Sequence, residues 1–220
     1  MAILLSPRLG YSRAEIISDG VVHAIGLVLA AVAVPVLIWT AATVRGDWAT
    51  VSATTVYGVT LIAMLGCSAV YNMAVTDRWL PILKRMDHSA IYLKIAGTYT
   101  PVVALTGGAG LPFLAGIWAA ALSGAGLKIV SPDRLRWLGL ALYLGLGWAG
   151  VALGGGLIEA LSGPALALVV AGGLTYTAGV VFFLWNRLPF HNTIWHAFVL
   201  AATICLYAAI YHEVAVPRVA

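Results

Sequence analysis

Polar side chains that could bind a ligand or a metal are concentrated near the ends of a few strongly apolar segments. Ser68 and Asn72 lie four residues apart, as do Asn192 and His196. On a helix, each pair would therefore lie on one face. A histidine in such a position can ligate a metal through one ring nitrogen, and a carboxylate can supply an oxygen ligand or hold a water molecule.

Further polar residues occupy comparable positions on two other apolar segments. They are Asp19, His23, Asp87 and His88, and His191 directly precedes Asn192. Four segments thus present polar groups at one predicted membrane level, where such groups are costly to bury. This convergence is the strongest indication of a site. The alternative is that these groups cap helices and bind interfacial water or lipid headgroups.

Lys94 lies seven residues after Asp87. At a rise of 1.5 Å per residue, it would lie about 10 Å deeper along the same helix. Two interpretations stay open for this lysine. It either faces the interior of a helix bundle and pairs with a polar group, or extends along the helix toward the interface.

The composition is typical of a membrane protein. Of the 220 residues, 62% are hydrophobic and 9% are charged, whereas a soluble domain has about 25% charged residues. Because this small number of charged side chains cannot cover a globular surface, lipid must be the main solvent of the protein. At roughly 20 apolar residues per span, the chain is long enough for about seven helices. It is therefore expected to form one membrane domain, residues 1–220.

Hydropathy predicts an all-α bundle of seven transmembrane helices. The predicted helices span residues 20–44, 49–75, 88–106, 111–129, 135–154, 161–185 and 192–213, after a short segment of residues 1–19. That segment lacks the order of a cleavable signal, so the first helix is expected to remain in the mature protein. Cys67 and Cys205 both lie within apolar runs, which disfavours a disulfide or a four-sulfur metal site.

The basic residues predict the orientation of these helices. Nine of the twelve lysines and arginines lie in the N-terminal segment or in the loops on its side of the membrane, when the edges of the loops are counted. Two lie on the opposite side, and Lys94 lies within a span. Because basic loops stay in the cytoplasm, we expect a cytoplasmic N-terminus and an external C-terminus. The net charge of +4 is better explained by this orientation than by nucleic-acid binding.

Four segments of the sequence together resemble the hemolysin III family, the bacterial relatives of the progestin and adipoQ receptors. They are EIISDGVVHAIG from Glu15, GCSAVYN from Gly66, MDHSAIYLKIAGTYTP from Met86 and HNTIWHAFVLAA from His191. The resemblance covers essentially the whole chain. It implies a seven-helix bundle in the bacterial cytoplasmic (inner) membrane, with a zinc site that faces the cytoplasm.

In that family, the zinc site contains a serine followed four residues later by a histidine, an aspartate, and a His-x-x-x-His pair. The resemblance places Ser68, Asp87 and His196 at matching positions. Asn72 and Asn192 stand where the family has histidines. Because an amide oxygen is a weaker ligand for Zn²⁺ than imidazole, the sequence predicts a degenerate site whose zinc affinity is lost or greatly reduced.

Other residues surround this predicted site. His191 adjoins Asn192 but is rotated by about 100° around a helix, so it cannot replace the missing ligand without a local rearrangement. His23 is a further candidate ligand. Asp19, His23, His191 and Lys94 are therefore assigned to the surrounding pocket.

Three functions remain as alternatives, with membrane lipids and a lipid or small molecule as the expected partners. The first is sensing of that ligand, or membrane homeostasis, without catalysis. The second, from similarity to alkaline ceramidases, is metal-dependent hydrolysis of a lipid amide, in which Asp87 and Ser68 position water or stabilise the developing oxyanion. The third is pore formation, which the family name suggests. The few charges along the spans do not indicate an aqueous lining.

Overall fold

The described part of the chain is built from helices. The structure is a computed structural model that describes residues 11–74, 77–107, 110–131 and 136–216. The long helices are α1 (Arg13–Thr40), α2 (Trp48–Met73), α3 (Leu80–Leu105), α4 (Leu111–Val130), α5 (Arg136–Leu153), α7 (Gly163–Leu184) and α8 (His191–Ala215). A π-helical turn, η1 (Ala41–Arg45), extends α1, and the short elements η2 (Asp77–Trp79) and α6 (Gly155–Glu159) belong to connections.

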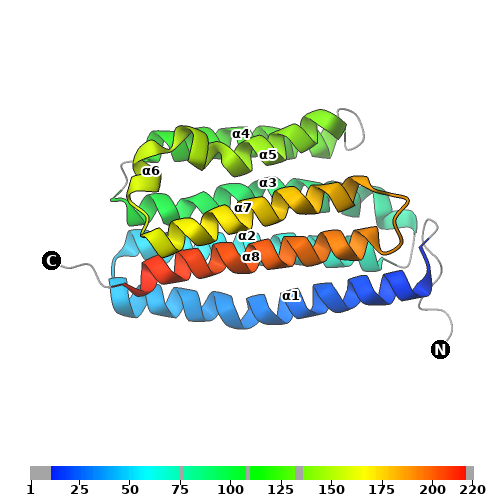
Figure 1. Ribbon diagram of the computed structural model, residues 1–220, viewed down its shortest axis with the longest axis horizontal. Coiled ribbons are helices and arrows are strands. Elements are labelled where there is room, and N and C mark those ends of the chain that lie inside the picture. Colours follow the sequence, from blue (N-terminus) through cyan, green and yellow to red (C-terminus); the bar gives the residue numbers. More distant parts are fainter. Residues whose placement is uncertain (1–10, 75–76, 108–109, 132–135, 217–220) are drawn as a thin grey trace.

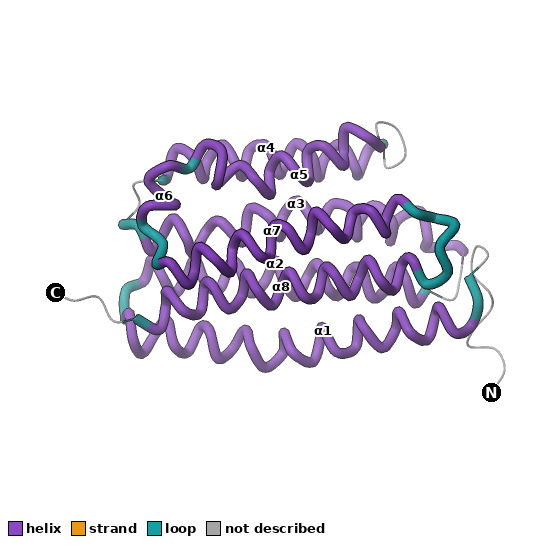
Figure 2. Tube along the Cα trace, in the orientation of Figure 1, coloured by secondary structure: helices purple, strands orange, loops and turns teal. Residues whose placement is uncertain are grey.

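The long helices lie side by side in one elongated bundle (Figures 1 and 2). In the view of Figure 1, α4 and α5 form one edge and α1 forms the other. The closest packing is between α7 and α8, between α2 and α3, and between α3 and α4, whereas α5 approaches α7 at few points. The start of α1 and the end of α8 lie at opposite ends of the bundle.

Five of the described helical segments are long and apolar enough to cross a membrane: Arg13–Arg45, Trp48–Met73, Leu111–Val130, Gly163–Leu184 and His191–Ala215. The apolar part of α5, Trp137–Leu153, is shorter. Large apolar side chains face outward, including Trp39 at 71% and Trp48 at 82% exposure, as expected of a surface that contacts lipid. The predicted all-α membrane architecture is confirmed at this level, and a count of seven spans stays a prediction.

Two helices begin earlier than the hydropathy predicted, and both differences have a local cause. α1 begins at Arg13, not at residue 20, because Ser12 and Glu15 form a capping box. The Glu15 carboxylate accepts a hydrogen bond from Ser12 N at 2.8 Å, and Ser12 Oγ accepts one from Glu15 N at 3.2 Å. α3 begins at Leu80, not at residue 88, with a proline in its first turn. Asp87 therefore lies inside α3 and is not its N-cap.

Two apolar clusters hold the bundle together, and they lie on different sides of it. The first joins α1, α2 and α8 through residues such as Leu37, Tyr57 and Ile210. The second joins α3, α4 and α5 through residues such as Tyr92 and Ile117. The cavity of the candidate site lies between these two clusters, because side chains associated with each of them line it.

Gly150 allows α5 to pack closely on α3. Its N–H donates a hydrogen bond to the hydroxyl of Tyr99 at 2.9 Å, and that hydroxyl donates to the carbonyl of Gly147 at 2.8 Å. A Cβ atom at Gly150 would lie 2.6 Å from Cε1 of Tyr99. This close approach is therefore possible only with a glycine, or after the tyrosine ring has moved.

Candidate functional site

Asp19 lies at the centre of a buried polar cluster that connects α1, α2 and α8. Its Oδ1 is 2.6 Å from Nδ1 of His196, and its Oδ2 accepts a hydrogen bond from Nδ2 of Asn192 at 3.2 Å. Asp19 is only 4% exposed. A carboxylate removed from water needs such partners, because an unpaired buried charge is very costly. The cluster therefore fixes the start of α8 against the first turns of α1.

His23 extends the cluster from α1 to α2. Its Nδ1 is 2.8 Å from the backbone carbonyl oxygen of Asp19, and its Nε2 is 3.1 Å from Oγ of Ser68. A carbonyl oxygen can only accept, so Nδ1 carries the proton and donates. In the neutral ring, Nε2 then has the lone pair. The rings of His23 and His196 also meet edge to face, with their centroids 4.5 Å apart.

The two asparagines at the family's histidine positions contact each other across α2 and α8. Asn192 Nδ2 donates to Oδ1 of Asn72 at 3.2 Å. Asn72 Nδ2 in turn donates to the backbone oxygen of Ser68 at 2.9 Å. The structure thus joins the two asparagines directly, while Asn192 and His196 share Asp19 as a partner.

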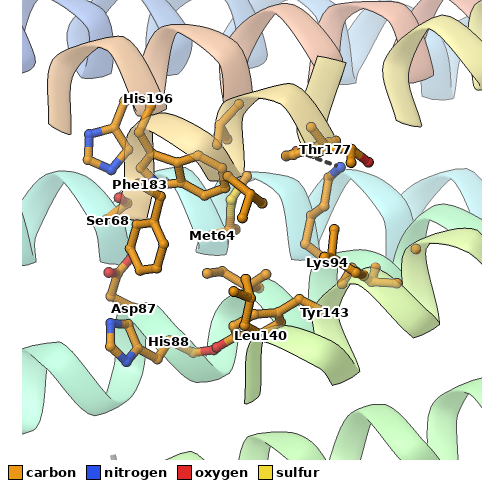
Figure 3. Close-up of a pocket in the computed structure, with 18 of the residues that line it drawn as sticks. Met64, Ser68, Asp87, His88, Lys94, Leu140, Tyr143, Thr177, Phe183 and His196 are labelled. Carbon is orange, nitrogen blue, oxygen red and sulfur yellow. Dashed lines mark hydrogen bonds between the residues drawn. The ribbon is translucent and has the colours of Figure 1, made fainter. Parts of the chain in front are cut away.

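A cavity of about 560 Å³ lies beside this cluster. Its polar lining includes Asp19, Ser68, Asn72, Asp87 and His196, which come from α1, α2, α3 and α8. In Figure 3, Ser68, Asp87 and His196 lie on one side of the pocket, and Lys94 lies farther along it. This volume falls in the range of small-molecule sites, about 300–1,000 Å³.

Lys94 points into the bundle, which is the first of the two interpretations left open by the sequence. It is only 3% exposed and lines the cavity. Its Nζ donates a hydrogen bond to the Tyr176 hydroxyl at 3.1 Å, and that hydroxyl lies 2.8 Å from Oγ1 of Thr203. The sequence did not identify Tyr176 or Thr203 as partners, because they lie on α7 and α8, far away in the chain.

His191 lies near the cluster but makes a different contact. Its Nε2 is 3.1 Å from the hydroxyl of Tyr11. In the same region, Glu15 accepts a hydrogen bond from the backbone N–H of Phe190 at 2.9 Å. His88 also lines the cavity, and its backbone oxygen accepts a hydrogen bond from Tyr143 at 2.9 Å. These contacts hold the helix ends around the cavity.

Asp19, His23 and His196 form a group that could bind a metal ion. Each offers one ligand atom, and these atoms all lie within 4.8 Å of one another. From the sequence, His23 was a further candidate ligand, whereas Asp19 was expected only in the surrounding pocket. Their spacing of four residues was the signal that could have identified them, since it places both on one helical face.

The ligand set implied by the family resemblance does not fit zinc in this chain. Positions 72 and 192 carry amides that are hydrogen-bonded to each other, so neither can supply an imidazole nitrogen. Of the matching residues, Ser68 contacts His23, and Asp87 lies on the cavity wall contributed by α3. Any metal at this end of the bundle would therefore need a different set of ligands.

The fold and the buried site define a polytopic α-helical membrane protein with a polar cluster beside an internal cavity. The chain belongs to the family described as "Haemolysin-III related", whose model matches residues 14–207. It is 35% identical to the "Hemolysin-3 homolog" of Bacillus subtilis (strain 168) over 206 residues, which cover 92% of this chain and 96% of that relative. It is 36% identical to "Hemolysin-3" of Bacillus cereus over 195 residues, which cover 88% and 89%.

These comparisons confirm the family resemblance found in the sequence. Together with the apolar helices, they make the chain an integral bacterial membrane protein.

Proposed function

We propose that this protein binds a lipid-like amphiphile inside the helix bundle, as a sensor or a membrane-homeostasis factor. The observation that carries this proposal is the cavity of about 560 Å³, which has a polar cluster at one side and an extended apolar lining. An occupant with one polar group and one apolar chain fits both parts.

The apolar lining favours an acyl chain. It is contributed by α3, α5, α7 and α8 through residues such as Ile95, Leu144, Val180 and Leu206. Transfer of apolar surface out of water into such surroundings is favourable by roughly 25 cal/mol per Å². An acyl chain from the membrane would fill this space without exposing polar groups to it.

Two groups of polar side chains at the cavity favour an oxygen-bearing headgroup. One is the cluster around Asp19 and Asn192. The other is Lys94, whose ammonium group has three N–H donors, one of them directed at Tyr176. The ester, amide or carboxylate oxygen of an amphiphile would accept from such a donor.

The site is proposed to face the cytoplasm. The starts of α1, α3 and α8 and the end of α2 lie at the same end of the bundle (Figure 1). Nine basic residues lie in the N-terminal segment, in the connections or in the helix ends on this side, against two on the other. The positive-inside rule then supports a seven-span topology with the N-terminus in the cytoplasm.

A second candidate is metal-dependent hydrolysis of a lipid amide. The observation that favours it is that Asp19 and His196, two members of the group that could bind a metal, also line the cavity. A divalent cation supplies Lewis acidity toward a carbonyl oxygen. Ser68 and Asp87 are the other polar residues that would meet the reacting part of the lipid.

One probe separates the two candidates. Radiolabelled palmitoylethanolamide carries an acyl chain and an amide, so binding and hydrolysis can be followed on the same molecule. We expect saturable binding to the protein purified in detergent. We expect Val180→Trp, which fills part of the cavity, to weaken binding by at least about tenfold, and Val181→Trp to serve as the matched control. Val181 is the next residue on α7 and is 56% exposed.

Equal binding by both tryptophan variants and the wild type would contradict the cavity as the binding site. Release of palmitate that disappears in Asp87→Asn would favour the hydrolase. Conductance in liposomes that contain the protein would instead favour pore formation, the activity suggested by the names of the two relatives.

A further inference from the structure

We propose that Asp19, His23 and His196 form a binding site for a divalent transition-metal ion, and that α1 supplies two of its three ligands. This set differs from the one that the family resemblance implies. It places the metal against α1 and α8, in place of a site shared by α2, α3 and α8.

The donor chemistry fits such an ion. Two imidazoles and one carboxylate are a ligand set of zinc sites that keep a further position open. The three ligand atoms lie within 4.8 Å of one another. Two ligands bound at about 2.1 Å to one ion are at most about 4.2 Å apart, so small side-chain rotations bring all three within reach. Both Asp19 and His196 line the cavity, which provides a route for the ion.

The surroundings of His23 resemble those of a metal ligand. Its Nδ1–H donates to the backbone oxygen of Asp19 at 2.8 Å. Histidines that ligate a metal usually donate their other N–H to a carbonyl or carboxylate in this way, which fixes the ring and its tautomer. The Nε2 lone pair then faces the Ser68 hydroxyl at 3.1 Å, and a bound metal ion would replace this contact.

The carboxylate is held in a comparable way. Asn192 donates to Oδ2 of Asp19 at 3.2 Å, while Oδ1 lies 2.6 Å from Nδ1 of His196. One oxygen is thus oriented by an amide, and the other faces a histidine. Asn192 therefore acts as a positioning residue for the ligand Asp19, although the family has a histidine ligand at that position.

The alternative is that Asp19 and His196 form an ion pair without a metal. The two cases predict different results for metal titration. The protein, purified with a tag that lacks histidine and stripped with a chelator, is titrated with Zn²⁺ and, separately, with Co²⁺. We expect one ion per chain, a visible Co²⁺ absorption spectrum, and a higher melting temperature in the presence of Zn²⁺.

Variants locate the ligands. Asp19→Asn, His23→Gln and His196→Gln are each expected to weaken Zn²⁺ binding by at least about 100-fold, beyond the 10–100-fold typical of residues that only orient a ligand. His191→Gln is the matched control: His191 is also buried and lies at the start of α8, but it contacts Tyr11. It is expected to change the dissociation constant by less than about threefold.

Asp87→Asn distinguishes the two ligand sets. Retained zinc binding in this variant, together with its loss in Asp19→Asn, supports the proposed site. The opposite pattern, or a wild-type protein that binds neither metal, overturns it. Melting curves recorded in chelator show whether each variant is folded, so a loss of binding is not mistaken for a loss of structure. Because no lipid is needed, the result is independent of amphiphile binding.

Discussion

The contacts of Asp19 predict a large loss of stability when only its charge is removed. In Asp19→Asn, the amide oxygen can still accept from His196, but the amide N–H groups would face the Nδ2 donor of Asn192. In the variant, the bond to His196 at 2.6 Å thus loses its charge assistance, and the bond from Asn192 at 3.2 Å is lost. Hydrogen bonds to charged groups contribute about 1.5–3 kcal/mol each.

We expect the free energy of unfolding to fall by about 3 kcal/mol, the lower end of the sum for two such bonds, because the bond to His196 is retained in a weaker form. For chains of 150–250 residues, 1 kcal/mol corresponds to about 2–4 °C in melting temperature. We therefore expect Asp19→Asn to melt roughly 9 °C below the wild type. The assay is thermal unfolding in detergent with chelator present, so that no metal contributes.

The matched control is Glu159→Gln, which makes the same chemical change at an exposed position of α6. It is expected to shift the melting temperature by no more than about 2 °C, because surface substitutions usually change stability by under about 0.5 kcal/mol. The double variant Asp19→Asn/His196→Gln should be less destabilised than the sum of the two single variants, because the side chains share one interaction. A melting temperature of Asp19→Asn within 2 °C of the wild type would refute this account of the cluster.

Three further predictions concern the packing, the buried lysine and the topology. Gly150→Ala is expected to lower stability by about 1–3 kcal/mol, because the added Cβ displaces the ring of Tyr99. Gly145→Ala is the control, since its Cβ meets nothing within 4 Å, and it should be neutral or stabilising in thermal unfolding. Equal effects of the two substitutions would contradict the close contact. Lys94→Met should melt between 0 and about 5 °C above the wild type, because the substitution removes a buried charge. The same variant should bind palmitate more weakly. A marked fall in melting temperature would show instead that the lysine stabilises the fold. The orientation is tested with single cysteines in a variant that lacks the native cysteines. Pro189→Cys should react with an impermeant maleimide only in inside-out vesicles, and Ala160→Cys only in intact cells. The reverse pattern would invert the proposed orientation.

The local pattern of the sequence was sufficient for the architecture. Apolar runs near the length of a membrane span, with few charges between them, leave the backbone no partner other than itself, so helices are the only solution. For the same reason, the helix ends were less well predicted. α1 starts at a capping box that includes Ser12, and α3 starts at Leu80 with a proline in its first turn. A hydropathy profile does not detect either signal, because the sequence there is polar.

The sequence by itself also determined which residue types can do chemistry and that Asn72 and Asn192 lack the imidazoles of the family pattern. Only the tertiary structure decided that Asp19 is the residue to which His196 and Asn192 are bound, and that Lys94 turns inward to Tyr176. The physical reason is that spacing along a helix fixes which side chains share a face. It does not fix which face of another helix, more than 80 residues away in the chain, will lie opposite.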